Sequence, residues 1–445
     1  MFKPTLLAAA LACALPTPAL AVTEAELASL RAEFDQKLKD LQASYEARLR
    51  EMEARLAQAA PSPEPAPAPQ VARGNDFNPE VSVVLAGSYA QRKPGERRPT
   101  GFLQDAEIGA PARGFSLDDS ELILAANIDP WFRGQATVIL ADGQAIVEEA
   151  WFQTLALDHG LTLKGGRYIS GIGYANEQHP HAWDFADNSL MYQVLFGEHY
   201  VQDGLQLKWL APSDTFLELG MEVGRGAAFP GSEAGGDQNG AGAWAAFAHL
   251  GGDVGDASSW RAGLSYLGAR PKDRESLLVD AGGVDAGTLF SGESKTWIAD
   301  FVWKWAPDGN PKSRNLKFQS EYFQRDEEGE LVYDPGGAHS AGAYRARQSG
   351  WYAQGVWQFL PRWRAGLRYD RLTNGSLDYG VNNANLPQTD YRPSKWSLMA
   401  DYSPSEYSRF RLQLARDHAM QGNPDDHQVT VQYIQSLGAH GGHKF

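Results

Sequence analysis

The sequence of 445 residues has little cysteine and no long apolar run. No apolar stretch approaches the roughly 20 residues that a transmembrane helix needs, which excludes a helical membrane protein. The Gly-Xaa-Ser-Xaa-Gly and His-Glu-Xaa-Xaa-His motifs are absent, so no motif indicates an enzyme. Positive charge is also in deficit, and the net charge of −15 argues against a nucleic-acid partner.

The single cysteine, Cys13, lies in a segment that is typical of a secretory leader. In residues 1–21, Lys3 precedes an apolar run, and Ala19-Leu20-Ala21 predicts cleavage before Val22. The mature chain is then expected to contain no cysteine. This suits a protein that crosses an oxidising periplasm unfolded, because wrong disulfides cannot form.

Residues 22–60 predict a helical stalk. From Leu27 the apolar positions recur in steps of three, four and four, an eleven-residue repeat that predicts a straight or slightly right-handed coiled coil. A helix with one apolar stripe is expected to self-associate, and the alternative is an amphipathic helix lying on a barrel or a membrane. Residues 61–79 are rich in proline and predict an extended linker.

Residues 80–445 alternate in segments of about ten residues, as expected of a transmembrane β-barrel with about 16 antiparallel strands. The last segment has Val429, Val431 and Tyr433 on one face, and the chain ends on Phe445. The expected strands are Glu80–Gln91, Ser116–Ile128, Phe132–Ala141, Ala145–Leu157, Leu161–Tyr168, Tyr200–Leu210, Thr215–Arg225, Ala241–Leu250, Ser259–Gly268, Lys295–Trp305, Asn315–Arg325, Gly350–Phe359, Trp363–Arg371, Lys395–Tyr402, Ser408–Arg416 and His427–Leu437.

The connections and the aromatic residues favour the same architecture. Every second connection is short, such as Asp129-Pro130-Trp131, and most others are long and polar, such as 269–294, 326–349 and 372–394. Aromatic residues such as Trp303 gather at the short-turn ends of strands, and others such as Trp297 gather at the long-loop ends. Two aromatic girdles of this kind mark the interfaces of a membrane. The sequence therefore predicts a bacterial outer-membrane barrel with its termini and stalk in the periplasm.

A barrel of this size has room for an aqueous channel. Alternation places charged side chains of both signs on its inner face, including a group of four arginines on two nearby strands. This group could form a basic wall that attracts anions; the alternative is that these are paired lumen charges without a role in selectivity. The four residues are Arg364, Arg368, Arg409 and Arg411.

The third long connection, Ile169–His199, is too apolar for a free external loop and is expected to fold into the barrel as a constriction. It holds closely spaced imidazoles and carboxylates, which suit Zn²⁺ or another first-row metal. The alternative is that they fix the loop to the wall by hydrogen bonds. The candidate ligands are Glu177, His179, His181, Asp184, Asp187 and His199, with His440 and His443 as a sparser second pair.

A helical stalk, a proline-rich linker, a sixteen-strand barrel and a constricting third loop together resemble the phosphate-selective porins. This resemblance implies a homotrimer. The loop segment from Gly173 to Phe185 and the C-terminal segment from Ser436 to Phe445 look more like proteobacterial proteins described as zinc-regulated, TonB-dependent outer-membrane receptors. That second resemblance implies a connection with zinc.

Three functions follow from these observations. The first is a passive porin for small hydrophilic solutes or ions, possessing no required cofactor and biased toward metal ions by its third loop. The second is a structural tether whose stalk contacts peptidoglycan or a periplasmic partner while the barrel is an anchor in outer-membrane lipid. The third is energy-coupled metal uptake, for which the chain offers no segment of the size of a globular plug.

Overall fold

The computed structural model describes residues 36, 37, 39, 40, 43, 50, 79–95, 99–105, 111–141, 143–386, 388–422 and 425–438. The chain divides into the units Met1–Asp76 and Phe77–Phe445. In the first unit the six described residues are helical and exposed. The signal peptide, most of the stalk and of the linker, and His440 and His443 lie outside the described residues, so the coiled coil and the second histidine pair stay predictions.

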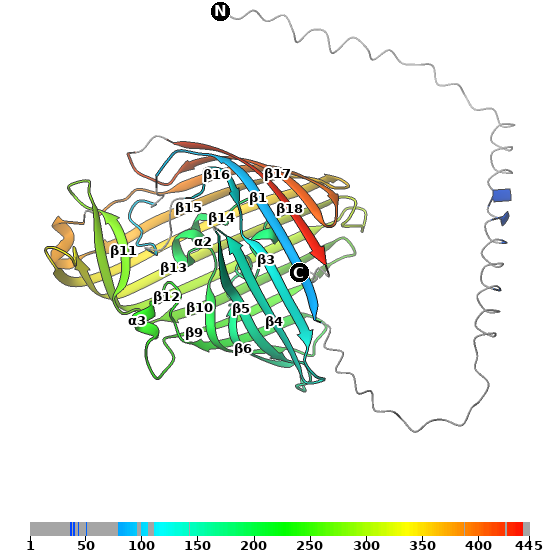
Figure 1. Ribbon diagram of the computed structural model, residues 1–445, viewed down its shortest axis with the longest axis horizontal. Coiled ribbons are helices and arrows are strands. Elements are labelled where there is room, and N and C mark those ends of the chain that lie inside the picture. Colours follow the sequence, from blue (N-terminus) through cyan, green and yellow to red (C-terminus); the bar gives the residue numbers. More distant parts are fainter. Residues whose placement is uncertain are drawn as a thin grey trace, which may run out of the picture. The chain divides into compact units, whose positions relative to one another are not determined.

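The second unit is a closed antiparallel barrel in which most strands pair with their neighbours in the chain. The last strand returns to the first, with Leu437 opposite Val83, and the two lie side by side in Figure 1. The strands are β1 (Glu80–Gln91), β2 (Gly114–Leu117), β3 (Ser120–Asn127), β4 (Phe132–Ala141), β5 (Gln144–Thr154), β6 (Leu161–Ile169), β7 (Val201–Leu210), β8 (Phe216–Gly224), β9 (Ala243–Val254), β10 (Ser258–Ala269), β11 (Arg274–Val279), β12 (Asp285–Trp305), β13 (Asn315–Tyr333), β14 (Ser340–Leu360), β15 (Trp363–Asp378), β16 (Ser394–Ser405), β17 (Ser408–His418) and β18 (Asp426–Gly438).

The prediction of a sixteen-strand barrel is confirmed. Strands β2 and β3 share one position in the wall because both pair with β1. Strand β11 pairs with residues 285–290 of β12, whereas β10 pairs with residues 294–305 of the same strand. Strand β11 therefore forms a hairpin with the start of β12 and does not add a position in the wall. Each of the sixteen expected segments coincides with one position in the wall.

Four strands extend well beyond their predicted ends, so the expected loops 269–294, 326–349 and 372–394 are partly strand. These are β12 to β15, which form a long ribbon at the long-loop end of the barrel. The outer face of the extension is polar and is joined by cross-strand ion pairs, such as Arg345 with Glu328 at 2.6 Å and Arg347 with Asp326 at 2.5 Å. Its inner face carries a buried apolar cluster that includes Phe290, Leu331 and Tyr344, but its outer face is polar, so the pattern of a lipid-facing strand does not detect it.

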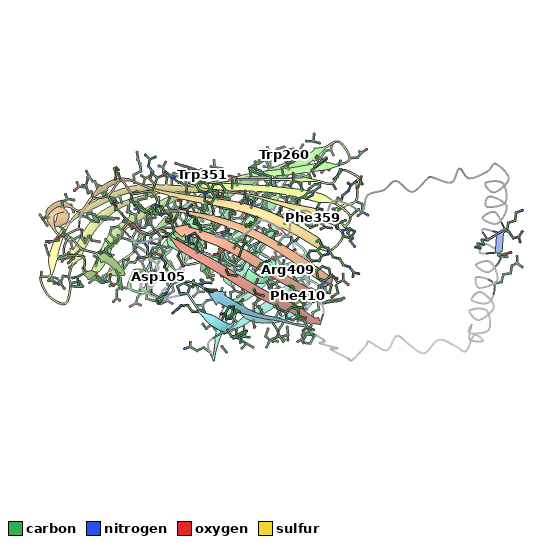
Figure 2. The ribbon with its side chains drawn as sticks, turned by 90° about the horizontal axis from the view of Figure 1, so that it is seen from above. Asp105, Trp260, Trp351, Phe359, Arg409 and Phe410 are labelled. Atoms are coloured by element: carbon green, nitrogen blue, oxygen red, sulfur yellow. The ribbon has the colours of Figure 1, made fainter. Side chains whose placement is uncertain are left out.

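The outer face of the barrel is apolar and carries two rows of aromatic rings, as predicted. At the long-loop end, the rings of Trp244, Tyr266 and Trp297 follow one another across three strands at 4.7 Å. Trp351 and Phe359 are both exposed on β14 and are labelled in Figure 2. They are separated by roughly 27 Å along the strand, which after the usual tilt spans most of a membrane's apolar band.

The connection between β6 and β7, residues 170–200, lies inside the ring of strands and is called the inner loop below. It contains the short elements η1 (Pro180–Ala182) and α2 (Leu190–Phe196). None of the helices in the described part of the chain is long and apolar enough to span a membrane. Two further short helices, α3 (Glu233–Gly236) and η2 (Gly380–Ala384), belong to other long connections.

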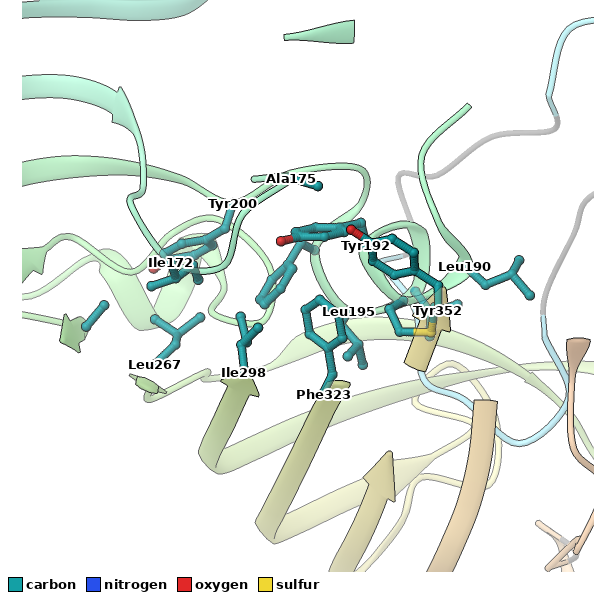
Figure 3. Close-up of a cluster of buried hydrophobic side chains, with 14 of the residues drawn as sticks. Ile172, Ala175, Leu190, Tyr192, Leu195, Tyr200, Leu267, Ile298, Phe323 and Tyr352 are labelled. Atoms are coloured by element: carbon teal, nitrogen blue, oxygen red, sulfur yellow. The ribbon is translucent and has the colours of Figure 1, made fainter. Parts of the chain in front are cut away.

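An apolar cluster joins the inner loop to the barrel wall. Ile172, Tyr192 and Leu195 of the loop pack against Ile298 on β12 and Phe323 on β13, as Figure 3 shows. The rings of Tyr192 and Phe323 meet edge to face at 5.1 Å. The wall side chains face inward and are completely covered, so this part of the barrel interior is packed with side chains like the core of a soluble protein.

Candidate functional site

Two wall carboxylates bind the backbone of the inner loop. Glu222 on β8 accepts from the Ser170 hydroxyl at 2.6 Å and from the backbone N–H of Gly171 at 2.9 Å. Glu321 on β13 accepts from the backbone N–H of Ala175 at 2.9 Å. Both carboxylates are almost completely buried. They satisfy the N–H groups of a segment that has left its β-sheet, and such groups are costly when buried without a partner.

Glycine is required at position 173 of the inner loop. Its backbone adopts a φ of 69°, a conformation that side-chain-bearing residues rarely adopt. A Cβ there would lie 2.4 Å from the hydroxyl of Tyr192 and 2.7 Å from Glu321 Oε2. The loop backbone therefore passes close to Tyr192 of α2 and Glu321 of the wall.

Two carboxylates of the inner loop bind cations of the wall. Asp184 Oδ1 lies 3.0 Å from Arg364 Nη1, and Asp187 Oδ1 lies 2.6 Å from Arg368 Nη2. Both arginines come from β15. A second cation accompanies each carboxylate: Lys317 for Asp184 and Lys395 for Asp187.

These cations keep both loop carboxylates charged. Burial opposes the charged form of each aspartate, but the neighbouring cations outweigh it. Lys317 and Arg364 hold the pKa of Asp184 below its ordinary value, and Lys395 and Arg368 do the same for the pKa of Asp187. Both aspartates belong to the inner loop and lie outside the membrane-spanning strands.

All four predicted pore-lining arginines contact the inner loop. Besides the two on β15, Arg411 on β17 donates to the carbonyl oxygen of Phe185 at 2.7 Å and to that of Trp183. Arg409, labelled in Figure 2, donates to the carbonyl oxygen of His181. The predicted basic wall is thus engaged by loop carboxylates and carbonyl groups, which is the arrangement of the paired-charge alternative.

The inner loop also contacts the wall through a cluster of three histidines and three glutamates, called the His–Glu cluster below. His179 Nδ1 lies 3.0 Å from Glu148 Oε2 and 3.4 Å from Glu121 Oε2. His181 Nδ1 lies 2.7 Å from Glu121 Oε1, and His199 Nε2 lies 3.0 Å from Glu148 Oε1. The sixth member is Glu149, whose Oε2 lies 3.3 Å from His179 Nε2.

A β-bulge brings two of these glutamates to the same face. Between β4 and β5 the register shifts, so that Thr137 opposes Glu149 while Val138 opposes Val147. Glu148 is the extra residue, and both glutamates are buried on the inner side of the wall. In a regular strand one of two consecutive side chains would face outward, so the bulge is what places both carboxylates at the loop.

Three of the six residues predicted as metal ligands come together in the structure: His179, His181 and His199. Asp184 and Asp187 lie elsewhere, paired with lysine and arginine. Glu177 also stands apart, since its charge acts on Lys208 of β7. Their closeness in sequence was misleading because the loop crosses the lumen and turns successive side chains toward different strands.

The sequence analysis missed the wall glutamates Glu121, Glu148 and Glu149. One signal was available: consecutive glutamates lie within the expected strand Ala145–Leu157. Strict alternation would expose one of them to lipid, where a charge is expensive. A bulge turning both inward resolves that conflict.

No family model matches the chain. A protein of Aquifex aeolicus, described as an uncharacterized protein, is 31% identical over 398 residues, which cover 83% of this chain and 80% of the relative. The chain belongs to the family of this protein. The resemblances to phosphate-selective porins and to zinc-regulated receptors stay predictions.

Two solved outer-membrane proteins are similar to this chain. The loop-deletion variant OmpTdeltaL8 of OmpT, an outer membrane protein of Vibrio cholerae, matches with a TM-score of 0.50 at 11% identity, over 81% of this chain and 99% of that chain. The outer membrane channel DcaP of Acinetobacter baumannii has a TM-score of 0.48 at 11% identity, over 82% of this chain and 99% of that chain. The first of these likenesses shows the fold alone.

Proposed function

We propose that the protein is an outer-membrane channel through which small hydrophilic solutes or ions diffuse passively, with the inner loop as its constriction. The observation that carries this proposal is that charged side chains of the inner wall bind a loop that crosses the lumen. A barrel built only as an anchor needs no such loop. A sixteen-strand barrel is also wide enough for an aqueous path.

The outer surface supports the membrane location. Leucine, valine and aromatic side chains are exposed on the outer face, among them Leu205, Leu264 and Leu398. The polar residues next to these three, Gln206, Ser265 and Ser397, are buried. An exposed apolar band bounded by aromatic rows would aggregate in water and is stable in a bilayer. We place the barrel in the bacterial outer membrane with its short turns in the periplasm.

The assembly is part of the same proposal. We infer a homotrimer held by the stalk of residues 22–60, which would lie in the periplasm and could also reach peptidoglycan or a periplasmic partner. This inference rests on the eleven-residue repeat, since a helix with one apolar stripe gains stability by burying it against copies of itself.

The test is single-channel recording with the purified full-length protein in a planar bilayer. A passive channel gives discrete conductance steps without an energy source, and a trimer gives them in groups of three. Protein unfolded by heat in the same detergent is the control. An intact barrel that gives no steps contradicts the channel proposal and favours a tether or an energy-coupled receptor.

A further inference from the structure

The His–Glu cluster contains the donor set of a transition-metal site. One ligand atom from each of Glu121, Glu148 and His179 lies within 4.8 Å of the other two. Two of these residues belong to separate strands of the wall and the third to the inner loop. One imidazole nitrogen and two carboxylate oxygens suit Zn²⁺ and its first-row neighbours, and three protein ligands leave a position open.

The surrounding groups orient these ligands as metal sites require. The His179 ring presents Nδ1 to Glu121 and Glu148, while its other nitrogen faces Glu149 Oε2 at 3.3 Å. A carboxylate on the far nitrogen fixes the tautomer and orientation of a ligating histidine. The second oxygens of Glu121 and Glu148 are held in turn by His181 and His199.

One buried carboxylate oxygen of the cluster accepts no hydrogen bond from the described residues. Glu121 Oε2 is buried and lies 3.4 Å from His179 Nδ1 without forming a hydrogen bond, and Glu121 is completely covered. Three carboxylates stand close together there, and their mutual repulsion and loss of hydration are costly. A divalent ion between them would offset both costs.

A route leads to the cluster from the long-loop end. A cavity of about 740 Å³ has Glu148 and His199 in its lining. Its remaining lining contains more carboxylates than cations, so it concentrates cations near the cluster. The acidic residues are Asp105, Asp203, Glu233, Asp273 and Glu275, and the basic ones are Arg167, Arg225 and Arg274.

We propose that Glu121, Glu148 and His179 bind one first-row divalent transition-metal ion, and that this ion clips the inner loop to strands β3 and β5. The binding site does not depend on the channel function. Its consequence, that the bound ion steadies the constriction and changes conductance, rests on the proposed function.

The test is calorimetric titration of the full-length protein with ZnCl₂ after treatment with EDTA. We expect about one ion per chain. Glu148→Gln and Glu121→Gln each remove a ligand and abolish this binding, whereas Glu149→Gln, which removes only the partner of the far nitrogen, weakens it roughly 10- to 100-fold. Cobalt substitution supplies a second readout. The ligand-field absorption of bound Co²⁺ should indicate a histidine nitrogen ligand in the wild type, and this contribution should disappear in His179→Ala.

Two control variants decide between this site and other zinc ligands. Glu222→Gln changes a buried carboxylate that also holds the inner loop but lies outside the cluster, so it should bind zinc like the wild type. The double variant His440→Ala/His443→Ala removes the C-terminal pair and should also bind normally. Folding of each variant is checked by circular dichroism. Unchanged zinc binding by folded Glu148→Gln, or its loss in the C-terminal double variant, overturns the proposal.

Conductance separates the two proposals. Zinc binding in a protein that gives no steps refutes the channel and leaves the site standing. Channel steps in a protein that binds no zinc refute the site and leave the channel standing. Where both hold, micromolar zinc should reduce the noise of the open state in the wild type and in Glu222→Gln, but not in Glu148→Gln.

Discussion

The Tyr192 hydroxyl donates to Glu321 Oε2 over 2.8 Å and so ties α2 of the inner loop to strand β13. Both residues are buried, and the tyrosine ring also packs edge to face on Phe323. This contact joins the apolar and the polar attachments of the loop at one point. The inner loop is therefore seated as a rigid element rather than held only at its two ends.

Tyr192→Phe keeps the ring and removes the hydrogen bond. Because Glu321 loses a donor in a buried position, we expect the free energy of unfolding to fall by about 1–3 kcal/mol. Denaturant unfolding followed by tryptophan fluorescence measures this change. Tyr333→Phe removes a bond of 3.0 Å to Asp280 at the end of β13, where both residues are only partly buried. An equal loss in the two variants would contradict the seating role of Tyr192.

Asp187→Asn should shift the ion preference of the channel toward anions. The substitution leaves the side chains of Arg368 and Lys395, each only 3% exposed, short of a counter-charge. We expect a loss of about 3 kcal/mol in stability and a reversal potential displaced toward that of chloride. Measurement in a potassium chloride gradient tests this. Asp308→Asn, which breaks the exposed pair with Arg314 in a short turn, should leave selectivity unchanged.

The attachment of the loop should resist moderate acid. The pKa values of Asp184 and Asp187 are lowered in the folded protein, so their stabilising effect is fully present above the ordinary aspartate pKa of about 3.9 and is lost as the pH falls below it. We expect conductance noise to be constant between pH 7 and about pH 5 and to rise below about pH 4. In Glu148→Gln the His–Glu cluster is already disrupted. A rise in conductance noise already at pH 6 in this variant would contradict the assignment of the acid response to Asp184 and Asp187.

Most of the barrel could be predicted from the sequence because its wall separates lipid from a polar interior. That separation imposes a period of two on every strand, and the predicted bounds of β1 and β4 agree with the structure. The extensions of β12 to β15 escaped detection because their outer faces are polar, and the apolar residues of their inner faces, such as Phe290 and Leu331, are few among many polar ones. Nothing in a polar alternating segment distinguishes a strand from a loop until its partners are known.

The site could be predicted only in part. The composition of the inner loop indicated that it folds inward, and its histidines do lie against the wall, with His181 buried. Their partners could not be found, because Glu121 and Glu148 are distant in sequence and the second of them depends on a bulge. Local spacing instead suggested Asp184 and Asp187, which form ion pairs with cations of the wall. Long-range pairing decided which carboxylates meet the imidazoles.

Deletion of residues 22–60 should abolish the trimer and leave the conducting barrel intact. The chain divides into separate units at Asp76, so the barrel is not expected to need the stalk for its folding. Light scattering of the purified variant should give a monomer that still produces conductance steps, now singly. Steps that remain in groups of three would assign trimerisation to the barrel.

The close approach at Gly173 gives a direct test of how the inner loop controls the channel. Gly173→Ala must fit a methyl group against the Tyr192 hydroxyl and Glu321, whereas Gly309 has a similar φ of 67° and nothing within 4 Å of an added Cβ. Gly309→Ala therefore reports the backbone cost alone, about 1 kcal/mol. Gly173→Ala should cost about 1–3 kcal/mol more because the overpacked loop must shift. If the loop is the constriction, conductance changes only in Gly173→Ala; a destabilised variant with unchanged conductance would show that solutes pass elsewhere in the barrel.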